Sequence, residues 1–208
     1  MASKRRLERR LAAVERFEEP RIDLEQYPTP PDIAAHVVNL AALRGDLAGR
    51  TVVDFGSGPG ILALGCAHRD PARVVGIEYD LAAIRIARRN VRALSPPLRP
   101  TWIRADATRP PLCLTDATVV MNPPFGAQAG HEHADRAFLA AAAQIARVTY
   151  SMHNAGSRDF ILAFAADEGG TVTDEVAVEM DLTRQFPFHD ADRTAIDVEL
   201  YRIEWDDG

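Results

Sequence analysis

At 208 residues, with 47% hydrophobic side chains, the chain has the size and composition of one domain with a sizeable core, and we expect a single domain over residues 1–208. It contains no long apolar run, and its charged start lacks the apolar core of a secretory signal, so we expect neither a membrane protein nor a secreted one. Thirty acidic residues against 24 basic ones give a net charge of −6, and Lys4 is the only lysine.

The acidic excess favours a halophilic protein adapted to high internal salt. The alternative is drift in base composition alone, which would explain the abundant arginine and alanine but not the acidic excess. In about 1 M salt the Debye length is only about 3 Å, so a basic patch would contribute little to binding a nucleic acid. An acidic chain is therefore compatible with a nucleic-acid substrate. Cys66 and Cys113 lack metal-ligand spacing, so the sequence predicts no metal site and two small buried thiols in a reducing, cytoplasmic setting.

Residues 4–17 are predicted to form an amphipathic helix that ends before Pro20, because apolar side chains recur there at helical spacing. These side chains are Leu7, Leu11, Val14 and Phe17. Residues 24–31 follow as a stiff, extended approach that is rich in proline. Thr29 is suited to cap the next helix, with Pro30 at the first helical position.

From residue 51 onward, predicted strands alternate with predicted helices. The strands are residues 51–55, 73–78, 101–105, 117–121 and 148–152, and the helices are residues 61–67, 81–94, 134–146 and 158–166. Repeated strand–helix units predict a parallel sheet covered by helices. Two alternating segments, residues 172–182 and 196–203, have no helix between them and predict an antiparallel hairpin at the end of the sheet. The fold class is therefore α/β, with a seven-stranded, mostly parallel sheet and helices on both faces.

A glycine-rich turn at residues 54–60 follows the first strand and opens a helix. The residues Gly56, Gly58 and Pro59 allow a tight turn and close approach of the backbone to a ligand. Asp54, at the strand end, would repel a pyrophosphate but suits a zwitterionic amino-acid group. This favours S-adenosylmethionine over a nicotinamide cofactor.

Acidic residues also close the next two strands. Glu78 ends the second strand, where a carboxylate can accept hydrogen bonds from both ribose hydroxyls of a cofactor. Asp106 follows the third strand, where it can accept from the cofactor's adenine amino group. Asp80 is the better candidate for capping the following helix. Each acid taken alone could be an ordinary solvated residue at the end of a loop. Ligands bind at the carboxyl ends of parallel strands, so three acids at three successive strand ends favour a cofactor site.

The fourth strand leads into Asn122, Pro123, Pro124 and Phe125. Such a turn suits the presentation of a planar exocyclic amine to an electrophilic methyl group. The Asn122 side-chain oxygen and a turn carbonyl can accept the two amine hydrogens, and the prolines stiffen the turn without adding N–H groups. Phe125 offers a face for stacking. The alternative is an ordinary proline-containing loop, against which the neighbouring acids argue.

His131 and His133 flank Glu132 just after this turn. A third metal ligand is not evident, so a substrate loop is the preferred interpretation and no metal is expected.

Together these motifs resemble the class I S-adenosylmethionine-dependent amino-methyltransferases, which have a Rossmann-like fold. Longer stretches are more specific, namely LEQYPTP (24–30), VMNPPFG (120–126), AFL (137–139), YSMH (150–153) and IDVEL (196–200). They are similar to the methyltransferase-like protein 5 family and its archaeal relatives, over nearly the whole chain. The resemblance implies N6-methylation of one adenosine in small-subunit ribosomal RNA.

The resemblance also implies particular residues and a partner. The implied cofactor contacts are Gln26, Thr29, Gly56, Pro59, Glu78, Asp106 and Ala107, and the implied catalytic turn is Asn122 to Phe125. Residues 1–45 would supply an N-terminal helix and a segment that covers the cofactor. The partner would be a small zinc-binding activator of the Trm112 type. One departure is that residues 126–128 read Gly-Ala-Gln where the family commonly has Gly-Thr-Lys.

Similar turns also methylate other amines, namely guanine N2 in RNA, adenine in DNA, or a glutamine amide of a release factor. A different kind of alternative is a non-catalytic protein of ribosome assembly. The third strand, residues 101–105, should lie at an open edge of the sheet, where an activator protein can add a strand. The opposing possibility is that Trp102 packs inward and the edge stays bare.

Overall fold

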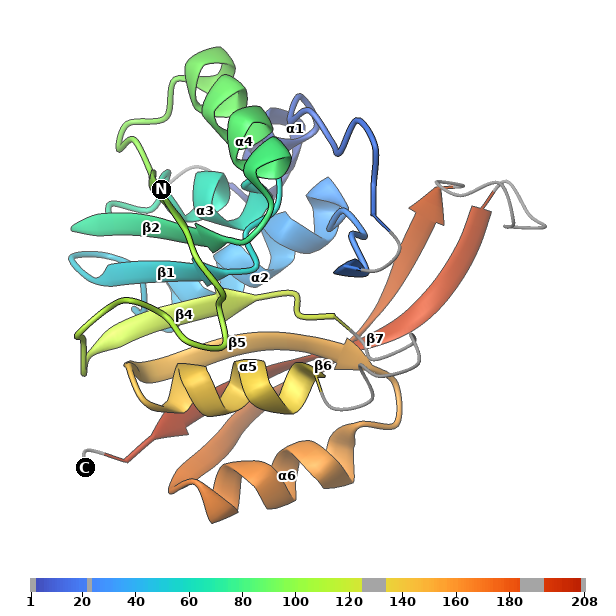
Figure 1. Ribbon diagram of the computed structural model, residues 1–208. Helices are drawn as coiled ribbons and strands as arrows, with labels where there is room; N and C mark the ends of the chain where they lie inside the picture. The colour runs from blue at the N-terminus through green and yellow to red at the C-terminus, as the bar shows by residue number, and fades with distance from the viewer. Residues whose placement is uncertain (1–2, 22–23, 125–133, 184–192, 207–208) are drawn as a thin grey trace.

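The computed structural model describes residues 3–21, 24–124, 134–183 and 193–206. Its strands are β1 (Thr51–Phe55), β2 (Arg73–Glu78), β3 (Thr101–Arg104), β4 (Ala117–Met121), β5 (Ala146–Asn154), β6 (Gly170–Thr183) and β7 (Arg193–Trp205). In these ranges they form a seven-stranded sheet in the order β3-β2-β1-β4-β5-β7-β6 (Figure 1). The strands β1 to β5 are parallel, whereas β7 is antiparallel to both of its neighbours. The predicted Rossmann-like sheet with a C-terminal antiparallel hairpin is confirmed.

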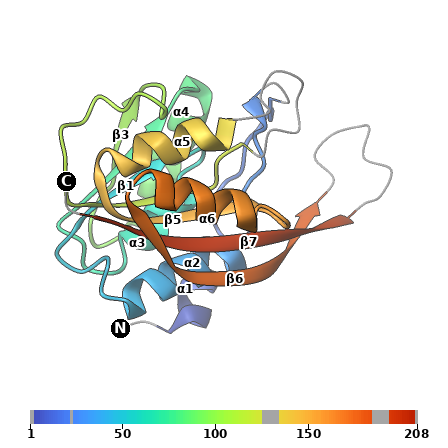
Figure 2. The same cartoon turned by 90° about the horizontal axis from the view of Figure 1, so that it is seen from below.

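Helices cover both faces of the sheet (Figures 1 and 2). One face carries α1 (Lys4–Leu11), α2 (Pro31–Leu43) and α3 (Ile61–Cys66), whose apolar side chains share one buried cluster with the sheet. The other face carries α5 (Ala134–Ala143) and α6 (Arg158–Asp167), which pack in a second cluster. The helix α4 (Leu81–Leu94) lies against β2 and β3. None of the described helices is both long and apolar enough to cross a membrane.

The central strands are buried on both faces. Every residue of β4 is buried, and so is every residue of β1 after Thr51. Continuous runs of β-branched and other apolar residues are typical of parallel strands that are covered on both sides. The bounds of β1, β2, β4 and α4 are as predicted, and the other predicted elements from residue 51 onward agree within three residues.

The first helix is shorter than the sequence predicts. It ends at Leu11, whereas the apolar spacing predicts a helix to Phe17. The reason is a tertiary contact, because the side chain of Asn90 in α4 binds the backbone of Glu15. Its Oδ1 accepts from the Glu15 N–H at 2.8 Å, and its Nδ2 donates to the Glu15 carbonyl at 3.0 Å. Both backbone groups of Glu15 are thus used outside a helix, and residues 12–18 run across the sheet end instead.

Two smaller predictions are wrong. Thr29 does not cap α2, since that helix starts at Pro31 with Pro30 as its N-cap and no side-chain cap bond. Cys113 is exposed, because it lies in the loop between β3 and β4, whereas Cys66 is buried in α3 as predicted.

A buried carboxylate ties the C-terminal hairpin to the rest of the sheet. Asp46, in the loop between α2 and β1, accepts at Oδ2 from the Tyr150 hydroxyl at 2.6 Å and from Arg202 Nε at 2.9 Å. Its Oδ1 accepts from Arg147 at 2.9 Å. Burial and the bond to Asp46 raise the pKa of Tyr150, so the tyrosine remains a donor. The cluster joins the loop before β1 to β5 and β7.

We predict that Asp46→Ala lowers the free energy of unfolding by about 3–5 kcal/mol, because it removes the buried counter-charge of Arg202 and leaves that guanidinium only the half-exposed carboxylate of Glu204. Tyr150→Phe is the matched control, since it keeps the Asp46–Arg202 ion pair, removes only the hydroxyl bonds to those two charged groups and should cost less, about 1.5–3 kcal/mol. Urea unfolding of both variants measures the difference. Equal losses in the two variants would contradict the central role of Asp46.

Candidate functional site

Polar groups gather where the parallel strands end. The registers of β1 with β2 and with β4 are in step, so Gly56, Glu78 and Asn122 directly follow residues that are paired with one another. Asp54 is the penultimate residue of β1, and Asp106 lies two residues beyond β3. The structure therefore brings together the strand-end residues that the sequence singles out, at the edge where ligands bind in such sheets.

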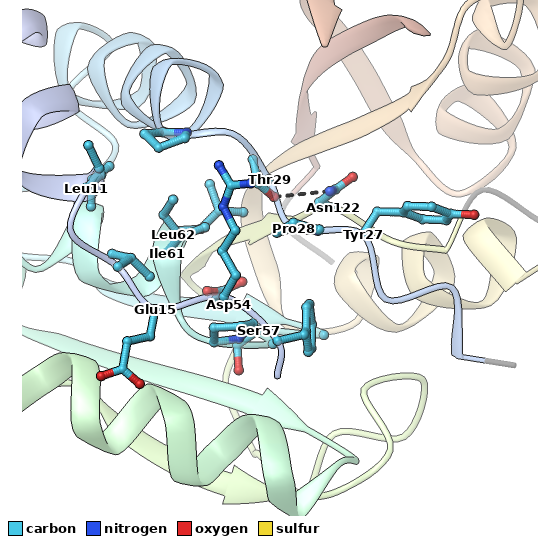
Figure 3. A pocket seen from close by; sticks show the side chains of 18 residues that line it. Leu11, Glu15, Tyr27, Pro28, Thr29, Asp54, Ser57, Ile61, Leu62 and Asn122 are labelled. Carbon is cyan, nitrogen blue, oxygen red and sulfur yellow. Dashed lines mark hydrogen bonds between the residues drawn. The ribbon is translucent and has the colours of Figure 1, made fainter. Parts of the chain in front are cut away.

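Two adjoining cavities open at this edge. The larger has a volume of about 340 Å³, within the range of roughly 300–1,000 Å³ of small-molecule sites. The smaller lies over Asp54 and the glycine-rich turn (Figure 3). Both are lined by Phe17, Tyr27, Gly56 and Asn122. The shared lining makes them two parts of one site.

Aromatic rings press on the glycine-rich turn. Gly58 and Gly60 have positive φ values of 50° and 89°. A Cβ at Gly58 would lie 2.8 Å from the Phe17 ring, and one at Gly60 would lie 2.5 Å from the Trp102 ring. Side chains at either position would therefore strain the backbone and collide with a ring. Trp102 thus packs inward from the edge strand β3 and supports the turn from behind.

Asp54 is buried, with 1% of its surface exposed. Its Oδ2 accepts from the Ala63 N–H of α3 at 2.8 Å. Burial raises the pKa of Asp54 to about 8, the bond from Ala63 opposes the rise, and the charge of Glu78 adds to it. A cationic ammonium group bound here would stabilise the charged carboxylate.

Glu78 holds the glycine-rich turn as well as lining the larger cavity. Its Oε2 accepts from the Gly58 N–H at 2.7 Å, and its Oε1 accepts from the Asp80 N–H at 2.8 Å. Burial raises the pKa of Glu78, and these backbone bonds oppose the rise. Each carboxylate oxygen can accept a second hydrogen bond, so a ribose diol can bind to Glu78 without displacing these two backbone N–H groups. Asp80 caps α4 through a 2.8 Å bond from Ala82, as predicted.

The polar cofactor candidates Gln26 and Asp106 also have protein partners. Gln26 Nε2 donates to Asp80 Oδ2 at 2.9 Å, and its Oε1 accepts from the Arg21 N–H at 2.9 Å. Asp106 Oδ1 accepts from the N–H and hydroxyl of Thr108 at 2.9 and 2.7 Å. Its other oxygen is left for a donor such as an exocyclic amine. Ala107 is buried beside it and lines the same cavity.

The catalytic candidate Asn122 has one satisfied end and one open end. Its Nδ2 donates to the Thr29 hydroxyl at 3.1 Å (Figure 3). Its Oδ1 is buried and has no hydrogen-bond partner among the described residues. A buried acceptor without a partner costs about 1–3 kcal/mol, which a ligand with an N–H donor would recover. Pro123 and Pro124 follow it in the turn, and Phe125 lies outside the described residues, as do His131, Glu132 and His133.

The sequence analysis missed several aromatic residues of the site. Phe17 lies over the glycine-rich turn, Tyr27 and Phe138 line the larger cavity, and Tyr79 beside Glu78 is 60% exposed. Phe17 was part of an apolar pattern that predicted a helix, so its signal was present but misassigned. Tyr27 stands in the proline-rich segment, and no spacing rule singles it out.

The residues present fit S-adenosylmethionine. The buried Asp54 suits its ammonium group, Glu78 its ribose, and Asp106 its adenine amino group. With the cofactor held by these acids, the Asn122 oxygen would be available to a second ligand with N–H donors.

Comparisons with known proteins find methyltransferases among the relatives of this chain. The family model of the methyltransferase small domain matches residues 31–149. The rRNA N(6)-adenosine-methyltransferase Mettl5 of Drosophila melanogaster is 35% identical over 96% of this chain and 95% of that protein. MJ0284 of Methanocaldococcus jannaschii is 30% identical over 98% of this chain and 95% of that protein. The crystal structure of PH1948 from Pyrococcus horikoshii superposes with a TM-score of 0.88 at 33% identity, covering 99% and 98% of the two chains.

The raised pKa of Asp54 predicts a pH-dependent gain from Asp54→Asn. Below its unfolded pKa of 3.8 the protonated acid favours the folded state, and this benefit is lost as pH rises towards about 8. An asparagine cannot ionise and can still accept from Ala63. We therefore compare the melting temperatures of Asp54→Asn and the unchanged protein, both without cofactor. The difference, variant minus unchanged protein, should increase by at least roughly 2–4 °C between pH 5 and pH 8, which is the shift for about 1 kcal/mol.

Asp159→Asn, at an exposed carboxylate in α6, controls for the loss of a surface charge. Thermal unfolding across pH 5–8 gives the difference, and a difference that does not change with pH would contradict the prediction. The same Asp54 variant should bind S-adenosylmethionine more weakly, as calorimetry would show.

Proposed function

This chain belongs to the methyltransferase-like protein 5 family of S-adenosylmethionine-dependent methyltransferases, and we propose that it methylates the N6 amino group of an adenosine in small-subunit ribosomal RNA. The observation that carries the proposal is the buried oxygen of Asn122, which has no hydrogen-bond partner in the part of the chain that the structure describes and lies in the same cavity lining as Glu78 and Asp106. An acceptor held open in that place suits a planar amine better than a hydroxyl, a thiol or a carbon nucleophile.

The chemistry divides between the cofactor and the chain. S-adenosylmethionine supplies an electrophilic methyl group. Asn122 Oδ1 accepts one N–H of the adenine amine and so directs its lone pair at that methyl group. As the N–C bond forms, the C–S bond breaks and its electron pair stays on sulfur, and the methylated amine then releases a proton to water. The chain contributes mainly position, so no general base is required.

Ribosomal RNA as the substrate class rests on the relatives. The Drosophila protein that matches along its whole length bears the name of an rRNA N(6)-adenosine-methyltransferase. An adenine in a helix would have to leave its stack to reach Asn122, whereas an unpaired one can enter directly. Tyr27 and Phe138 give the larger cavity aromatic faces against which a flat base can pack.

The test compares ribosomal RNA from cells with and without this gene by mass mapping of nucleosides. Loss of one N6-methyladenosine from small-subunit RNA is the expected result. Loss of N2-methylguanosine, of a methylated DNA adenine, or of a methylated glutamine would assign the same chemistry to another amine. Unchanged methylation with defective ribosome assembly would favour a non-catalytic role.

We predict that Asn122→Ala slows methyl transfer to ribosomal RNA by roughly 100-fold or more, the range for loss of one preorganised polar group in an active site. Affinity for S-adenosylmethionine should stay nearly unchanged, because the acids that hold it lie on other strands. Single-turnover transfer and calorimetry measure the two quantities. Near-normal transfer by the variant would rule out the assigned role.

A zinc-binding activator protein of the Trm112 type is the proposed partner, joined at the edge of β3. This strand is at the end of the sheet order and pairs with β2 on one side. The Ala105 N–H donates to the Glu78 carbonyl at 3.1 Å. Backbone N–H groups point alternately to the two sides of a strand, so the N–H of Ile103 also points to β2. The N–H groups of Trp102 and Arg104 therefore point to the open side of β3. The side chain of Trp102 packs inward, so an added strand would use the backbone of β3 and the exposed Arg104.

Arg104→Pro should therefore prevent the activator from binding, because it removes an outward N–H from the edge. Arg104→Ala is the matched control, since it removes the guanidinium and keeps the N–H. Co-expression followed by size-exclusion chromatography in high salt tests both. Separate elution of the unchanged proteins, with this chain active alone, would exclude the partner.

A further inference from the structure

Thr29 lies on the wall of the site opposite the turn that carries Asn122. The two residues are 93 positions apart in the chain and are joined by the 3.1 Å bond from Asn122 Nδ2 to Thr29 Oγ1. Figure 3 shows the amide nitrogen directed at Thr29 and the amide oxygen turned away from it. The family resemblance implied a cofactor contact for Thr29, and the sequence pattern a helix cap. The structure shows no capping bond from Thr29, and the hydroxyl binds Asn122.

The bond decides which end of the amide is available. An asparagine side chain has a donor end and an acceptor end, which exchange places on a half-turn of the amide. Here Nδ2 donates to the Thr29 hydroxyl, and the acceptor end is the one that has no partner among the residues described. An amine substrate needs this orientation, because both of its hydrogens require acceptors.

Thr29 is itself held in a fixed position. It is 7% exposed and stands between Pro28 and Pro30, whose rings restrict the backbone on both sides. On one side α2 begins at Pro31, and on the other Gln26 is bonded to Asp80. A hydroxyl on such a segment can hold an amide without much loss of conformational entropy.

We propose that Thr29 is a positioning residue for methyl transfer, and that its hydroxyl fixes the Asn122 amide with the oxygen free to accept the substrate amine. The proposal rests on the function proposed above for Asn122. It separates two groups of residues, those that hold the cofactor and those that orient the acceptor, and places Thr29 in the second.

Two substitutions at one position test it. Thr29→Val keeps the shape and removes the hydroxyl, and Thr29→Ser keeps the hydroxyl and removes a methyl group. The Val variant should lower the single-turnover rate of transfer to ribosomal RNA by about 10-fold or more, while the Ser variant stays within about threefold of the unchanged protein. Calorimetric affinity for S-adenosylmethionine should be nearly the same in all three.

A double variant makes the dependence on Asn122 explicit. If Thr29 acts through Asn122, then Thr29→Val combined with Asn122→Ala should be no slower than Asn122→Ala alone. A further loss in the double variant would overturn the proposal. So would a Val variant with a normal rate, or one whose loss is entirely in cofactor affinity, which would return Thr29 to the cofactor group.

A measurement without substrate separates this proposal from the proposed function. The side-chain amide signals of Asn122 in a ¹⁵N NMR spectrum can be identified by their absence from Asn122→Ala. They should shift in Thr29→Val and stay in place in Thr29→Ser. Unchanged signals in the Val variant would overturn the positioning role. Shifted signals in a protein that methylates no ribosomal RNA would instead contradict the function alone.

Discussion

The parallel register of β1 with β2 and β4 determines where every polar group of the site lies. Phe55 is paired with Ile77 on one side and with Met121 on the other, so the next residue in each strand direction (Gly56, Glu78 and Asn122) meets the same space. A slip of one residue in either pairing would send the side chain of Glu78 or Asn122 to the opposite face of the sheet. The buried valines of these strands fix the register, and through it they place the acids that suit a cofactor next to an amide that suits its substrate.

The segment before α2 is positioned from the sheet rather than by its own secondary structure. Asn90 binds the backbone of Glu15 and the carbonyl of Pro59, Asp80 binds Gln26, and Asn122 binds Thr29. The bond to Pro59 joins Asn90 to the glycine-rich turn, and each of the others joins a side chain of α4 or of a strand end to the segment before α2. The wall of the site is thus assembled by long-range polar contacts, and the proline-rich sequence keeps it extended so that these contacts can form.

The difference between local and long-range information explains what the sequence could predict. Strand ends, the glycine-rich turn and the cap at Asp80 follow from local chemistry, and the structure places them as expected. The end of α1, the partner of Thr29 and the packing of Trp102 depend on residues far away in the chain. The spacing of Phe17 favoured a helix on local grounds, but the two bonds that Asn90 makes to Glu15 outweigh that preference. No local pattern carries such information.

The site contains two features that are unfavourable in the protein without ligands. Asp54 is a buried acid whose pKa is raised to about 8, and Asn122 has a buried oxygen for which the described part of the chain offers no hydrogen-bond partner. Both costs fall on groups that a cation and an amine would satisfy, and the surrounding α3 and the Thr29 segment prevent either group from turning away. The fold therefore holds two unsatisfied polar groups in fixed positions, at a cost to the stability of the folded chain. Ligands that satisfy these groups recover that free energy when they bind. Because the two acceptors lie on neighbouring strands, the same register that creates the cost also directs the cofactor and the amine towards each other.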